Sequence, residues 1–80
     1  MSALVEIAGK AIADYGFRQV VLYSPEDVVA QWGLSPEEAG VLRGAVLDEL
    51  DKLPIPVEPE DVPAETERLA GVIDAALRSG

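Results

Sequence analysis

Residues 24–42 read SPEDVVAQWGLSPEEAGVL, and this stretch contains two helix starts separated by a helix stop. Ser24-Pro25 and Ser35-Pro36 each place a hydroxyl at a cap position and a proline at the first helical position, where an amide N–H has no intrahelical partner. Gly33 can adopt the left-handed conformation that commonly ends a helix. The stretch therefore predicts a helix over 25–32, a tight turn, and a second helix that begins at Pro36 with an S-x-x-E capping box.

The second helix of this pair should continue to residue 53, because Pro54 cannot extend it. Its apolar stripe consists of Leu42, Val46, Leu50 and Leu53. Gly40 and Gly44 interrupt the same helix, and each glycine costs about 1 kcal/mol relative to alanine. Their presence indicates either the close approach of a neighbouring helix or a softened helix.

Amphipathic segments flank this central part of the chain. Residues 2–15 have apolar side chains at spacings of three and four, with Ser2 as a cap and Gly16 as the expected stop. Residues 62–78 repeat that periodicity and place Arg78 at the negative end of the helix. The apolar face of this last helix is formed by Leu69, Val72, Ile73, Ala76 and Leu77.

Residues 17–23 are ambiguous, because their β-branched and aromatic side chains favour a strand. The only available strand partner is the Pro-rich stretch 55–57, and Pro54 and Pro56 cannot donate ladder hydrogen bonds. We therefore expect 17–23 to be an extended connector or an irregular helix. The predicted fold is all-α: a single domain over 1–80 with about four helices (2–15, 25–32, 36–53 and 62–78) and a Pro-rich connector at 54–63.

The composition excludes several kinds of chemistry. The 80 residues contain 15 Asp+Glu and 6 Lys+Arg, a net charge of -9, with no His and no Cys. The chain therefore has no disulfide, thiolate nucleophile, imidazole base or usual zinc ligand. Its acidic runs lack the spacing of a calcium loop, and a helical bundle of this size has little room for a catalytic cleft. We expect a protein that is not an enzyme and binds no cofactor or metal.

The same composition disfavours membrane and nucleic-acid partners. The N-terminal segment lacks the basic region of a signal peptide, and no apolar run approaches the roughly 20 residues of a membrane span. We expect a cytoplasmic protein. An excess of acids over bases opposes binding to phosphates and to anionic lipids.

The 25–42 segment also has the outline of a helix-turn-helix. A DNA-reading version needs basic or amide side chains at the exposed start of its second helix, but this chain has Glu37 and Glu38 there. We interpret the segment as a structural hairpin. A DNA-binding regulator, acting as a homodimer, stays the alternative.

Residues 24–43 resemble a known hairpin through SPEDVV, then GLSPEE, then Leu42-Arg43. The pattern is similar to the hairpin in the small helical α subunit of protocatechuate-type ring-opening dioxygenases. It also resembles a hairpin in the helical recognition domains of modified-peptide precursors. The resemblance implies a non-catalytic helical module that docks onto an enzyme.

Acidic side chains are concentrated between residues 48 and 67, where Lys52 is the single base. Such a run is either a solvated face that keeps a small domain soluble or a docking surface steered toward a basic partner. A special case of docking is mimicry of nucleic acid. The acids of the run are Asp48, Glu49, Asp51, Glu58, Glu60, Asp61, Glu65 and Glu67.

The aromatic residues supply candidate anchors for such a surface. Tyr15 and Trp32 fit core faces at helical spacing, whereas Tyr23 or Trp32 could be an exposed anchor, because both residue types are enriched at interface hot spots. The predicted function is a non-enzymatic, acidic helical protein–protein interaction module: an accessory subunit, adaptor or inhibitor. Its predicted partner-binding residues are the eight acids of the run together with Trp32 and Tyr23.

Overall fold

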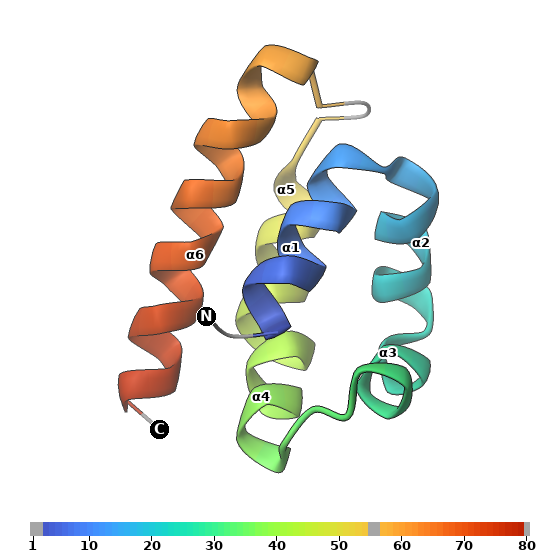
Figure 1. Cartoon of the computed structure of the whole chain (residues 1–80), viewed down its shortest axis with the longest axis vertical. Coiled ribbons are helices and arrows are strands. Elements are labelled where there is room, and N and C mark those ends of the chain that lie inside the picture. The colour runs from blue at the N-terminus through green and yellow to red at the C-terminus, as the bar shows by residue number, and fades with distance from the viewer. Residues whose placement is uncertain (1–2, 55–56, 80) are drawn as a thin grey trace.

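The computed structural model describes residues 3–54 and 57–79, and every regular element among them is helical (Figure 1). The fold is therefore all-α, as predicted, but it has five helices rather than about four. The helix predicted over 36–53 is one continuous helix in three parts: α4, a π-helical turn called η1, and α5. The elements are α1 (Ala3–Ala13), α2 (Tyr15–Tyr23), α3 (Pro25–Trp32), α4 (Pro36–Val41), η1 (Leu42–Val46), α5 (Leu47–Lys52), a 3₁₀ turn η2 (Pro59–Asp61) and α6 (Val62–Ser79).

The additional helix is α2, which corrects the prediction for residues 14–23. The expected helix over 2–15 ends at Ala13, and residues 17–23 belong to a regular α-helix instead of the expected extended connector or irregular helix. Asp14 causes the break, because its Oδ1 accepts hydrogen bonds from the amides of Gly16 (2.9 Å) and Phe17 (3.3 Å) and so starts a new helix. Gly16 therefore lies in the first turn of α2 and does not end α1. The proposed cap Ser2 and the connector residues 55–56 lie outside the described residues.

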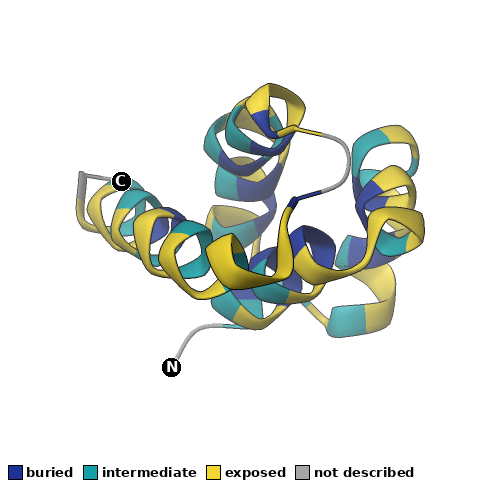
Figure 2. Cartoon of the chain, turned by 90° about the horizontal axis from the view of Figure 1, so that it is seen from above, coloured by how far each residue is buried: buried dark blue, intermediate teal, exposed yellow. Residues whose placement is uncertain are grey.

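Helix α1 occupies the centre of the fold, with α6 on one side and α2 on the other (Figure 1). The predicted apolar faces of the first and last helices therefore pack against each other. Gly9 of α1 faces the Thr66 side chain of α6, and an added Cβ would lie 3.4 Å from the Thr66 methyl group. Buried residues lie on the sides of the helices that face one another (Figure 2). The core cluster consists of Leu4, Ile7, Ala8, Ala11, Ile12, Val21, Val28, Leu42, Val46, Leu50, Leu53, Val57, Leu69 and Ile73.

The α3–α4 hairpin has the predicted geometry. Gly33 ends α3 in the left-handed region (φ 60°, ψ 43°). Ser35 and Glu38 form the capping box: the Glu38 amide donates to Ser35 Oγ (3.2 Å), and the Ser35 amide donates to a Glu38 carboxylate oxygen (3.0 Å). Ser24 occupies the cap position of α3, but its side chain makes no capping hydrogen bond.

The continuous helix α4–η1–α5 contains both glycines of the 36–53 segment. Among the described residues, no atom outside the helix's own backbone and the two adjacent residues lies within 4 Å of a Cβ built at Gly40 or Gly44, so the close-approach interpretation is wrong. Gly44 instead lies inside the π-helical turn η1, a wider turn that often occurs at functional sites. The helix ends at Lys52, next to an extended Leu53 and Pro54.

Within residues 3–54 and 57–79, none of the helices combines the length and the apolar content that crossing a membrane requires.

The core assignment predicts the effect of shortening a central side chain. Ile73 is buried within the core cluster, so Ile73→Ala should lower the free energy of unfolding by about 2–5 kcal/mol. Val20→Ala is the control, since Val20 is exposed and its truncation should change stability by about 0.5 kcal/mol or less. Urea denaturation followed by circular dichroism measures both values, and equal midpoints for the two variants would contradict this core.

Candidate protein-binding surface

Helix α2 carries an exposed apolar face. The exposed large apolar side chains that the structure describes are Tyr15 (38% exposed), Val20 (46%) and Tyr23 (80%), and all three belong to this helix. Tyr15 was expected in the core, but its ring lies at the surface, where its hydroxyl accepts a hydrogen bond from Gln19 Nε2 (2.9 Å). Tyr23 has the exposure that its predicted role as an anchor requires. Trp32 is half-buried and packs against the core cluster.

The buried side chain of Arg18 fixes the position of this exposed face. Only 1% of Arg18 is exposed, and it is the single charged residue among the buried side chains that the structure describes. Its Nη1 donates to the Leu53 carbonyl (3.4 Å) and its Nη2 to the Pro54 carbonyl (3.1 Å). These carbonyls follow the C-terminal end of α5, where the helix dipole is negative and favours a cation. The guanidinium also lies 5.3 Å from the centre of the Tyr15 ring, so one side chain joins α2 to the end of α5.

A small cavity of about 80 Å³ lies at the surface between α2 and α5. Tyr15, Gln19 and Tyr23 line it from α2, and Asp51 lines it from α5. The fold therefore brings together two of the predicted site residues, the anchor Tyr23 and the acid Asp51. Sequence reasoning did not predict this arrangement, because it depends on the helical conformation of residues 15–23 and on the buried Arg18.

The other acids of the 48–67 run follow α5, η2 and the start of α6. Asp48, Asp51, Glu67 and the acids of the connector are exposed, whereas Glu49 and Glu65 are partly buried. Arg68 joins these last two: it donates to Glu49 and to Glu65 (2.9 Å), so α5 and α6 are linked by an ion-pair network. The hydrogen bond from Arg68 holds the pKa of Glu49 below its ordinary value. Glu49 and Glu65 thus have a structural role as well as a negative charge.

Every basic side chain of the chain has an interaction within the molecule. The sequence has 6 Lys+Arg, and four of them form ion pairs with carboxylates. Arg43, for example, binds Glu26 through two hydrogen bonds of 2.5 and 2.6 Å. Lys10 lies over the Phe17 ring, Arg18 is buried, Lys52 pairs with Glu49, Arg68 with Glu49 and Glu65, and Arg78 with Asp74.

Nowhere in the part of the chain that the structure describes do three or more acidic side chains gather closely enough to hold a metal ion. The surface instead offers aromatic rings and separate carboxylates, which are groups that bind cationic and apolar side chains. The chain matches no protein-family model, no curated protein and no solved structure.

The two hydrogen bonds of the buried Arg18 guanidinium predict what happens when that guanidinium is removed. Arg18→Met should lower the free energy of unfolding by about 1–3 kcal/mol, because it leaves the buried Leu53 carbonyl without a donor. Arg18→Lys should lie between wild type and Arg18→Met, since an ammonium group cannot donate to both carbonyls with the same geometry. Gln19→Met is the matched control on the exposed side of α2. Thermal denaturation measures the melting temperatures of these variants, and equal values for Arg18→Met and Gln19→Met would contradict this role.

The Glu49–Arg68 pair predicts a pH dependence. Since the pKa of folded Glu49 is lowered from its ordinary 4.5, the pair stabilises the fold fully above about pH 4.5, and this contribution is lost as the pH falls through the lowered value. Glu49→Gln should therefore be less stable than wild type at pH 7, and the difference should shrink as the pH falls below 4.5. Denaturant midpoints at several pH values measure it. Glu67→Gln, at an exposed acid, should show no such convergence.

Proposed function

We propose that this chain is a non-enzymatic protein-binding module that docks a basic segment of a partner protein against the α2 face. The observation that carries this proposal is the position of Tyr23, which is 80% exposed and lines the same cavity as Asp51. An exposed tyrosine can bury a large area with little loss of side-chain entropy, and tyrosine is enriched among interface hot spots.

The chemistry of this face suits a lysine or arginine of the partner. The cation can lie over a tyrosine ring and donate to the Asp51 carboxylate, which combines a cation–π contact with a charge-assisted hydrogen bond. The other acids of the run lie on the same helix as Asp51 and on the segment that follows it, which includes η2 and α6. They add a field of the same sign, which accelerates association with a basic partner.

The internal pairing of the bases also supports a protein partner over nucleic acid. The helix-turn-helix alternative requires cations at the start of α4, but Glu37 is exposed there and Glu38 is held in the capping box. Nearby Arg43 is bound to Glu26. The proposal agrees with the resemblance of residues 24–43 to hairpins of modules that dock onto enzymes, and it fits an accessory subunit, adaptor or inhibitor in the cytoplasm.

Affinity capture from the native lysate at low salt tests this function. The tagged full chain should retain one stoichiometric protein, which mass spectrometry identifies, and Tyr23→Ala should weaken its binding at least about 30-fold, as expected of a hot-spot residue. Asp51→Asn should weaken binding and reduce its salt dependence. Glu6→Gln is the charge-matched control, because Glu6 is an exposed acid on α1. Retention of nucleic acid, or equal binding by all variants, would contradict the proposal.

A further inference from the structure

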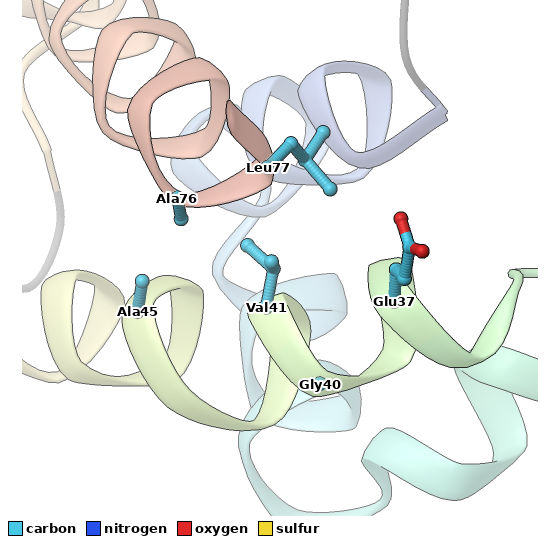
Figure 3. Close-up of a pocket in the computed structure, with 6 residues that line it drawn as sticks. All are labelled: Glu37, Gly40, Val41, Ala45, Ala76 and Leu77. Carbon is cyan, nitrogen blue, oxygen red and sulfur yellow. The ribbon is translucent and has the colours of Figure 1, made fainter. Parts of the chain in front are cut away.

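A second concave surface lies away from α2, between the α4–η1 part of the long helix and the end of α6. Its volume is about 360 Å³, within the range of small ligand pockets. Val41 and Ala45 point toward the last turns of α6 across the gap, and Glu37 lies at one end (Figure 3). The lining residues are Glu37, Gly40, Val41, Ala45, Ala76 and Leu77, and we call this surface the α4–α6 groove.

The groove explains why the apolar face of α6 is unevenly buried. Leu69 and Ile73 of this face belong to the buried core, but Ala76 and Leu77 are only half-buried at the groove wall. No residue of the described chain extends an atom to within 4 Å of a Cβ built at Gly40. The packing of this chain therefore leaves an apolar surface that a further side chain can cover.

The charge of the groove lining indicates which kind of molecule can cover the groove. Glu37 is the charged residue of the lining, and no ion-pair partner of it occurs in the described residues. A second copy of this chain is a poor occupant, because each copy has a net charge of -9 and its bases are already paired internally. An apolar segment that carries lysine or arginine is complementary to both the lining and Glu37.

The secondary structure of the occupant follows from the geometry of the groove. The described residues contain no strand edge that an extended peptide could join, whereas a groove between helices accepts the apolar face of another helix. We propose that the α4–α6 groove binds a basic amphipathic helix of a partner protein, with apolar side chains on Val41, Ala45 and Leu77 and a cation on Glu37. This inference rests on the proposed function only in requiring a protein partner, since it concerns a different surface.

A synthetic amphipathic helix made only of leucine and lysine, roughly 14 residues or about four turns long, is the probe. It is titrated into the isotopically labelled full chain, and backbone amide shifts are followed by NMR. The largest shifts should fall on residues 37–45 and 76–78. A peptide in which glutamate replaces lysine should bind at least about 10-fold more weakly, a difference of about 1.4 kcal/mol.

Two glycines provide a matched pair of variants. Gly40→Gln adds a polar side chain at a residue of the groove lining, whereas Gly44→Gln makes the same change one turn along the helix at a residue outside the lining. Neither clashes with another atom, because both positions are open. Gly40→Gln should weaken peptide binding about 10-fold or more, Gly44→Gln should leave it within about twofold, and Glu37→Gln should reduce its salt dependence.

The outcomes separate this inference from the proposed function. Peptide shifts confined to Tyr15, Val20, Tyr23 and Asp51 would overturn the groove and leave the α2 face as the binding surface. Shifts spread evenly over the acidic residues, or equal losses in Gly40→Gln and Gly44→Gln, would also overturn the groove. A third outcome combines the two experiments: the peptide binds in the groove, and the Tyr23→Ala variant still captures the lysate partner. This outcome would support the groove and contradict the proposed α2 face.

Discussion

The buried guanidinium of Arg18 is the constraint on which the arrangement of this molecule depends. A cation that leaves water must recover its interactions inside the protein, and the two Nη atoms of Arg18 do so at the carbonyls of Leu53 and Pro54, at the negative end of α5. Its buried Nε has no hydrogen-bond partner among the described residues. No carboxylate takes part in these contacts, although acids greatly outnumber bases in the chain. These two hydrogen bonds hold α2 against the end of α5, and they therefore place Tyr23 beside Asp51.

The pairing of the remaining bases determines the character of the surface. Arg43 and Arg68 join helices that are distant in sequence, through Glu26 and Glu49 respectively. Arg43, Lys52, Arg68 and Arg78 thus form ion pairs within the fold. Exposed ion pairs add little to stability, so the larger consequence of this pairing under the proposed function is that the cation bound at the α2 face comes from the partner.

Local signals in the sequence predicted the parts of the fold that local chemistry determines. The Ser35–Glu38 capping box, the Gly33 turn and the apolar periodicity of α1 and α6 are all visible in the residues themselves. The helix over residues 17–23 was not predicted, because its β-branched side chains favour a strand. A local cap, Asp14, and a tertiary contact, the burial of Arg18, support the helix instead. The α4–α6 groove could not be predicted either, since periodicity assigns Ala76 and Leu77 to the core without showing where α6 extends beyond its partners.

Of the predicted partner-binding residues, Tyr23 is exposed and lines one cavity together with Asp51, whereas Glu49 and Glu65 pair with Arg68. Hydrogen exchange of the Arg18 Nε–H, followed by NMR, tests the central claim most directly. The account predicts an Nε–H that exchanges much more slowly than those of Arg43 and Arg78, because Arg18 is 1% exposed. Exchange as fast as in these surface arginines would contradict it.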